Sequence, residues 1–133
     1  MGSMMLLYEA VRRKLPDKYK NVFYQYMRDD QIGDVGIYLY QGENDLYTID
    51  GETQYNTVKV HVQVNADKST QGLQEALDYL TEFVDRIENE QCDISNISFI
   101  SADHIGPKAI PIGRNEFDIQ VVKSDIQLKY VFD

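Results

Sequence analysis

Apolar residues recur every three to four positions in two parts of the chain, a spacing that predicts two amphipathic helices. The first helix is expected over residues 7–15 and ends at Pro16, which cannot continue a helix. The second is expected to run from a cap at Ser69 or Thr70 to about Glu90. The apolar stripes consist of Leu7, Val11 and Leu15 in the first helix, and of Leu73, Ala76, Leu77, Leu80, Val84 and Ile87 in the second. Each helix therefore has one face to bury.

Alternation of apolar and polar residues predicts the strands. Four main strands are expected at residues 34–40, 55–65, 94–101 and 116–133, with a short edge strand at residues 21–26. The clearest alternation lies in the second main strand, where valines occupy every second position from 58 to 64 and polar residues stand between them. One face of this strand should therefore lie in the core and the other in water.

The last strand segment changes its alternation part of the way along. Its apolar residues stand at odd positions up to Val121 and at even positions from Ile126 onwards. Because a slip of one residue exchanges the two faces of a strand, we expect a bulge or bend near residues 123–125. The alternative is that the last part leaves its own sheet and pairs with a neighbouring subunit.

Two connections between these elements are rich in turn-forming residues. Residues 41–54 carry glycine, asparagine and aspartate, which predict a long connection with a small hairpin turn at Asp50 and Gly51. Residues 102–115 contain two prolines and two glycines. These residues disfavour regular strand pairing, so we expect a structured loop there.

The order of the main elements is helix, two strands, helix, two strands, or αββαββ. This order predicts an α+β fold with a mostly antiparallel sheet and both helices packed on one face. The long helix should cross between two antiparallel hairpins. A length of 133 residues fits one domain. Residues 1–3 are typical of a cloning remnant, so the single domain is expected at residues 4–133.

The charge balance is acidic and narrows the choice of partners. The chain has 13 lysines and arginines against 22 aspartates and glutamates, a formal net charge of −9. This charge opposes a general attraction to nucleic acid or anionic lipid. A single cysteine, Cys92, cannot form an internal disulfide or supply a four-ligand zinc site by itself. No apolar run approaches the roughly 20 residues that a membrane span requires.

Sequence motifs for catalysis, nucleotide binding or zinc binding do not occur in the chain. We therefore expect a protein that is not an enzyme and that holds no cofactor or metal. One alternative is a small ligand-binding or metal-dependent enzyme that uses His61, Asp103 and His104, because two imidazoles and a carboxylate suffice for an open metal site. A second alternative is an adaptor that binds a basic partner through the acidic residues of the long helix, namely Glu82, Asp85, Glu88 and Glu90.

Several local sequences follow one another in a recognisable order. They are the amphipathic first helix, Asn21-Val22-Phe23-Tyr24, Val35-Gly36-Ile37-Tyr38-Leu39-Tyr40 leading to Gly42, the valine strand at 58–64, the acidic helix at 73–87, Gly106-Pro107, Pro111-Ile112-Gly113-Arg114 and Asn115-Glu116-Phe117. This succession covers nearly the whole chain and resembles the phage minor-capsid or tail-terminator family. Gln41-Gly42-Glu43-Asn44 departs from the paired glycines often found in that family.

The resemblance implies a structural role in a phage or prophage tail. Members of the family form a ring, commonly a hexamer, that stops growth of the tail tube and joins it to the head connector. The implied partners are further copies of the chain, the tail-tube protein and the head-connector protein. DNA would pass through the ring without specific binding, and no membrane partner is expected. The implied location is the virion tail, assembled in the cytoplasm of the bacterial host.

The assembly surface is expected on the two long connections and on the last strand. Apolar loop residues such as Ile105 and Ile110 motivate this choice, because assembly would bury them, although they can equally fold back under their own domain. Several tyrosines cluster between Tyr19 and Tyr55, and they suit either sheet packing or a protein interface. The candidate residues are Gly42, Tyr47, Tyr55, Ile105, Pro107, Ile110, Pro111, Ile112, Arg114, Tyr130 and Phe132.

Overall fold

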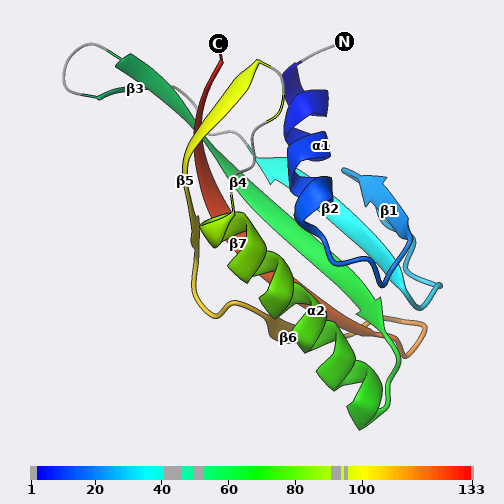
Figure 1. The fold of residues 1–133 in the computed structure, drawn as a ribbon. Coiled ribbons are helices and arrows are strands. Elements are labelled where there is room, and N and C mark those ends of the chain that lie inside the picture. Colours follow the sequence, from blue (N-terminus) through cyan, green and yellow to red (C-terminus); the bar gives the residue numbers. More distant parts are fainter. Residues whose placement is uncertain (1–2, 41–45, 50–52, 91–93, 95, 133) are drawn as a thin grey trace.

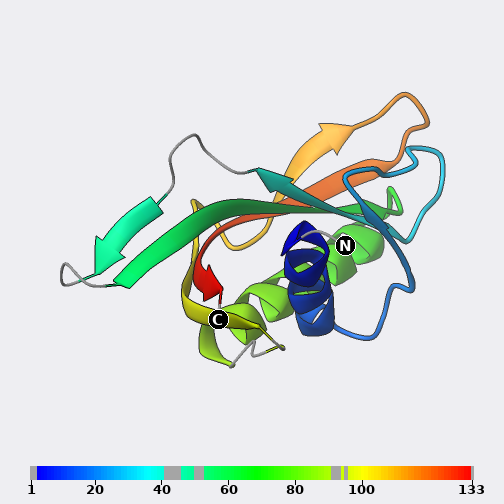
Figure 2. The ribbon, with the colours of Figure 1, turned by 90° about the horizontal axis from the view of Figure 1, so that it is seen from above.

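The computed structural model describes residues 3–40, 46–49, 53–90, 94 and 96–132, which contain two helices and seven strands. In chain order these are α1 (Ser3–Lys14), β1 (Asn21–Tyr24), β2 (Asp34–Tyr40), β3 (Leu46–Ile49), β4 (Thr53–Ala66), α2 (Thr70–Asn89), β5 (Ile97–His104), β6 (Ile110–Arg114) and β7 (Gln120–Phe132). Both helices lie on one face of the sheet (Figures 1 and 2). The predicted α+β class, with helices packed on a mostly antiparallel sheet, is confirmed.

The sheet has the order β1-β2-β4-β7-β5, with β3 paired to β4 and β6 paired to β7. The β2–β4 and β5–β7 pairs are antiparallel, as predicted, whereas the edge strand β1 runs parallel to β2. The helix α2 crosses from β4 to β5, and β7 lies between these two strands. The last strand is therefore central to the sheet, with β4 on one side and β5 and β6 on the other.

The core lies between the sheet and the two helices. The four alternating valines of β4 are at most 1% exposed, which confirms the buried face predicted for this strand. On α2 the buried positions include Leu80, Val84 and Ile87 from the predicted stripe, together with Tyr79 and Phe83. Burial of each large apolar side chain stabilises the fold by about 1.5–3 kcal/mol. Packing against the sheet therefore provides most of the stability of α2.

The predicted cap of the long helix is also confirmed. The Ser69 hydroxyl accepts a hydrogen bond of 3.0 Å from the backbone N–H of Gly72, which satisfies one of the free donors of the first turn. At the other helix, α1 begins at Ser3, so it includes one of the three residues attributed to a cloning remnant. It ends at Lys14, close to the stop expected from Pro16.

The bulge expected in the last strand is absent from β7 in the part paired with β4. The register runs without a shift from the Asn56–Tyr130 pair to the Ala66–Gln120 pair. The apparent change of alternation arises because Phe117 and Ile119 precede β7, which begins at Gln120, and because Val121, opposite Asn65, lies on the open face. Residues before β7 form a turn in which Asp118 has a φ of 60° and donates its N–H to the Asn115 carbonyl at 3.1 Å. The strand also stays in its own sheet, so the alternative pairing with another subunit is not needed.

The expected structured loop at residues 102–115 contains strand structure at both ends. The strand β5 extends to His104, and β6 pairs with β7 at residues 110–114. Pairing is possible because β6 is hydrogen-bonded to a strand on one side only, and a strand with an open side tolerates a proline. The register also shifts between Pro111 and Gly113. The left-handed φ of 116° at Gly113 accommodates this shift.

The long connection expected at residues 41–54 contains β3, which pairs with the start of β4 to form a hairpin. The proposed turn at Asp50 and Gly51 lies outside the described residues. The hairpin projects beyond the rest of the sheet (Figure 2). Within the described part of the chain, neither helix is long and apolar enough to cross a membrane.

Candidate assembly surface

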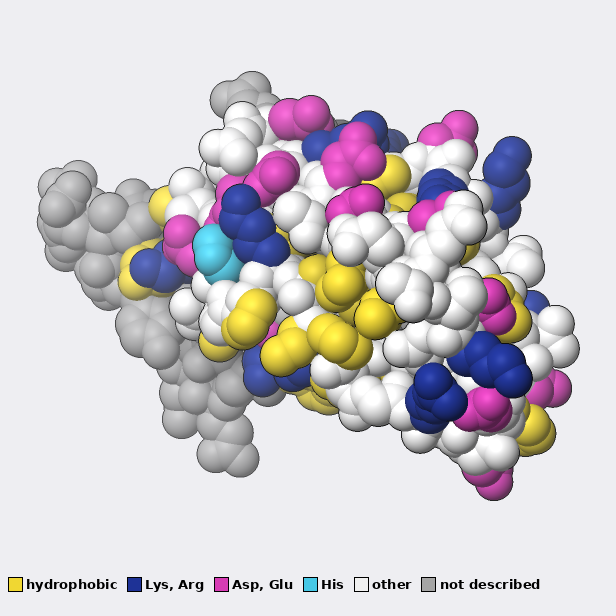
Figure 3. All heavy atoms as spheres, turned by 90° about the horizontal axis from the view of Figure 1, so that it is seen from below, with side chains coloured by type: hydrophobic (Ala, Val, Ile, Leu, Met, Phe, Trp, Pro, Cys, Tyr) yellow, Lys and Arg dark blue, Asp and Glu magenta, His cyan; other side chains and the backbone are white. Residues whose placement is uncertain are grey.

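The strand β6 presents apolar side chains at the edge of the sheet. All five of its residues are exposed, although the segment reads Ile-Pro-Ile-Gly-Arg. Ile110 is 37% exposed and Ile112 is 49% exposed, while Ile105, just after β5, is 47% exposed. Figure 3 shows hydrophobic side chains gathered in the middle of the face that carries β6. We call Ile105, Ile110 and Ile112 the isoleucine patch. These loop residues do not fold back under their own domain.

Local geometry explains why these isoleucines face solvent. The strand β6 has a paired neighbour, β7, on one side, and the described residues place no strand on its other side. At its end, the Arg114 guanidinium forms an ion pair of 3.1 Å with Asp118 in the following turn. Pro107 is exposed in the same connection, and Pro111 lies within β6. Five of the predicted residues between 105 and 112 are therefore exposed, in β6 or in the connection before it.

The remaining predicted surface residues are not gathered there. Tyr130 is fully buried in the core, so its side chain cannot lie on an assembly surface in this fold. Its position at an even site of β7, opposite Asn56, points it toward the helices. Tyr55 is half-buried, and the Lys129 ammonium lies 5.5 Å from the centre of its ring. Tyr47 and Phe132 belong to β3 and β7, and Gly42 lies outside the described residues.

The open face of the sheet carries a polar cluster centred on His61 of β4. Its Nδ1 lies 2.7 Å from Asp125 Oδ1 on β7, and its Nε2 lies 2.7 Å from Gln63 Oε1. The Lys123 ammonium donates to Asp125 Oδ2 at 2.6 Å. Burial alone would raise the pKa of Asp125, but hydrogen bonds from Lys123 and His61 outweigh it and leave this pKa below its ordinary value. Both ring nitrogens of His61 are thus engaged within the chain.

This cluster was missed in the sequence, although the register contains the signal. His61 and Asp125 are direct partners across the β4–β7 pair, so correct pairing of the two strands would have placed them together. A hollow of about 260 Å³ lies beside the cluster and is lined by Tyr38 and Gln63 together with Arg28, Asn65 and others. Arg28 does not contact this cluster through its guanidinium, which forms a bidentate ion pair with the buried Asp34 at 2.7 and 3.0 Å.

The residues of the enzyme alternative are not brought together. His61 lies on the open face, whereas His104 pairs with Ile126 and lies on the helix side, where its Nδ1 is 2.8 Å from Glu88 Oε2 of α2. Asp103 pairs with Gln127 and is exposed. The described residues contain no group of three or more histidine, cysteine, aspartate or glutamate side chains arranged to hold a metal ion.

The acidic residues of the adaptor alternative are paired within the chain. Each of the four contacts a basic side chain: Glu82 with Arg86, Asp85 with Lys108, Glu88 with His104 and Glu90 with Lys14, at 2.6–3.1 Å. Two of these contacts, those of His104 at the end of β5 and of Lys108 between β5 and β6, hold this part of the chain against α2. Their charges are therefore less available to an external basic partner than the sequence suggests.

Comparison with protein-family models and with curated proteins finds no match for this chain.

Proposed function

We propose that this chain is a structural tail-assembly protein of a phage or prophage, which forms a ring that terminates the tail tube and joins it to the head connector. The proposal begins from the succession of local sequences that resembles the tail-terminator family. The observation that carries it is the isoleucine patch, because three large apolar side chains at one sheet edge are typical of a surface that another protein covers.

A ring follows from repeated contacts between unlike surfaces. When each copy presents one surface to the next, the assembly closes if the rotation between neighbours closes, and it grows as a filament if it does not. A closed ring has two different rims, so one rim can bind the tube while the other binds the connector. The net charge of −9 suits a channel that DNA passes without being held.

The direct test of this function is removal of the gene from the phage or prophage that encodes the chain. Without a terminator, tubes should continue to grow, and electron micrographs should show tails of irregular, greater length that are not joined to filled heads. The purified chain added to growing tubes should stop their elongation. Tails of normal length on filled heads in the deletion strain would contradict the proposal.

A point substitution tests the role of the isoleucine patch. We expect Ile112→Asp to weaken each assembly contact by about 2 kcal/mol, roughly thirty-fold in its equilibrium constant, because a carboxylate replaces a side chain that assembly buries. Tail length and the fraction of joined particles are the measurements. Ile32→Asp is the matched control, since Ile32 is 59% exposed in the connection before β2. Equal loss in both variants would contradict a specific role for the patch.

A further inference from the structure

Positive and negative charge are separated along this chain. Residues 41–54, which include β3 and the start of β4, contain Glu43, Asp45, Asp50 and Glu52 and no lysine, arginine or histidine. Residues 11–20, at the end of α1 and after it, contain five lysines and arginines against one aspartate. Two short segments of opposite charge therefore stand out in a protein that is acidic as a whole.

Intramolecular ion pairs account for only part of the positive segment. Arg13 pairs with Glu9, Lys14 with Glu90 and Lys18 with Glu75. The other two cations, Arg12 and Lys20, form no ion pair with a carboxylate among the described residues; Arg12 donates to the Tyr24 hydroxyl at 3.3 Å. These two cations are therefore available to pair with carboxylates of a partner.

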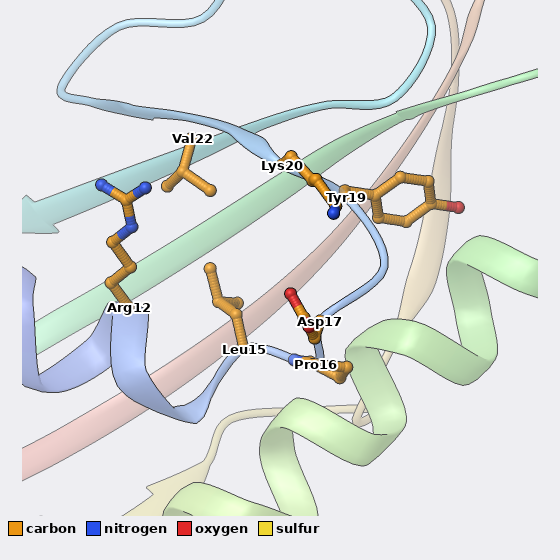
Figure 4. A pocket seen from close by; sticks show the side chains of 7 residues that line it. All are labelled: Arg12, Leu15, Pro16, Asp17, Tyr19, Lys20 and Val22. Carbon is orange, nitrogen blue, oxygen red and sulfur yellow. The ribbon is translucent and has the colours of Figure 1, made fainter.

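Arg12 and Lys20 line the same hollow, which has a volume of about 240 Å³. Figure 4 shows Arg12 on one side and Lys20 with Asp17 on the other, with Leu15 and Val22 between them. We call this site the basic hollow. Its apolar floor and two flanking cations suit a segment that carries carboxylates next to apolar side chains, and Asp17 leaves it a net charge of +1.

The basic hollow and the acidic hairpin lie at opposite ends of the molecule. The hairpin β3–β4 projects from one end of the sheet, whereas the segment between α1 and β1 lies at the other end (Figures 1 and 2). One copy cannot join its own hairpin to its own hollow in this arrangement. Two copies can, and the contact would be between unlike surfaces, which is the type that builds rings.

We propose that residues 41–54 of one copy dock in the basic hollow of the next copy. The inference rests on the proposed ring and identifies the contact between its subunits. The partner is a second copy because the chain itself supplies a segment with four carboxylates and no basic residue, which complements the two unpaired cations of the basic hollow. Apolar residues of the same segment, such as Leu46 and Ile49, accompany those charges.

Charge reversal in two variants tests the docking. The first is Arg12→Glu/Lys20→Glu, and the second reverses all four carboxylates of residues 41–54, Glu43→Lys/Asp45→Lys/Asp50→Lys/Glu52→Lys. Each variant alone carries like charges on its hairpin and hollow, so we expect self-association in sedimentation experiments at low salt to fall at least ten-fold. A mixture of the two variants restores opposite charges at each contact between unlike variants, so the mixture should assemble again.

Controls separate this effect from misfolding and from general charge. Thermal unfolding of each variant should match that of the wild type; Arg12 and Lys20 are exposed and form no ion pair with a carboxylate among the described residues. The double reversal Lys59→Glu/Lys68→Glu lowers the net charge by the same amount as Arg12→Glu/Lys20→Glu and should leave assembly intact. Raising the salt to about 0.5 M should weaken wild-type assembly.

Three results would overturn the docking. They are a wild-type chain that stays monomeric at low salt, variants that assemble like the wild type, and a mixture that fails to recover. Binding of a DNA oligonucleotide that is lost in Arg12→Glu/Lys20→Glu, without any change in self-association, would assign the hollow to phosphate instead. Tail termination is measured in a separate experiment. If the chain terminates tails normally but the variants assemble like the wild type, the proposed function stands and only the proposed subunit contact is wrong.

Discussion

His61 connects two central strands through its side chain as well as through the backbone register. The carboxylate of Asp125 receives hydrogen bonds from both His61 and Lys123, although the Asp125 side chain is only 10% exposed. Loss of one member of such a cluster leaves buried polar groups without partners, which costs more than the net value of each bond. The cluster therefore fixes the alignment of β4 and β7 on the face that no helix covers.

Acid sensitivity follows from the lowered pKa of Asp125. A carboxyl group whose folded pKa lies below its unfolded value of about 3.9 stabilises the fold above that pH, and this stabilisation disappears as the pH falls through the folded pKa. We expect Asp125→Asn to lower the free energy of unfolding at pH 7 by about 1–3 kcal/mol. In urea unfolding, the difference from wild type should shrink below about pH 4. A constant difference down to pH 2 would contradict this account.

Two buried tyrosines, unlike Asp125, have polar groups that form no hydrogen bond among the described residues. The hydroxyl groups of Tyr8 and Tyr79 are buried and have no hydrogen-bond partner among the described residues. Burial raises the pKa of Tyr79 above its ordinary value, which keeps the hydroxyl neutral. We expect Tyr79→Phe to stabilise the protein by up to about 1 kcal/mol in urea unfolding, because the unsatisfied hydroxyl is removed while the ring contact with Tyr19 remains. Tyr24→Phe is the control, since its hydroxyl has a partner in Arg12, and it should not stabilise.

Helices were more accessible to prediction than the sheet edges. The stripe of α2 and its Ser69 cap depend on residues close in sequence, so spacing alone located them. By contrast, the assignment of residues 110–114 to β6 depends on β7, a partner outside the segment, and on the tolerance of an edge strand for proline. The turn before Gln120 was likewise mistaken for a bulge, because alternation does not reveal where a strand begins.

The cap of α2 gives a local test at the scale of the element. Ser69→Ala removes the acceptor for the Gly72 N–H and should lower the free energy of unfolding by about 1 kcal/mol. Chemical denaturation measures the change. Thr70→Ala is the control, because Ser69 and not Thr70 accepts the capping hydrogen bond, and its effect should be less than about 0.5 kcal/mol. If both substitutions lowered the free energy of unfolding equally, the capping hydrogen bond of Ser69 would not stabilise the helix.

The molecule as a whole has unlike ends and one uncovered sheet face. The isoleucine patch lies on one edge, the hairpin projects from one end, and the basic hollow lies at the other. The sequence singles out apolar residues among turn formers between residues 105 and 112, and Ile105, Ile110 and Ile112 are exposed there. Sequence reasoning could not anticipate that Tyr130 is buried, because both faces of a strand carry apolar residues and only the register selects one.

The central strand of the sheet follows all of its neighbours in the chain. β4, β5 and β6 each hydrogen-bond to β7, which is synthesised after them. During synthesis on the ribosome, the backbone groups of these three strands that bond to β7 stay unpaired until β7 leaves the exit tunnel. The native pairing of these three strands with β7 can therefore form only at the end of synthesis of the domain.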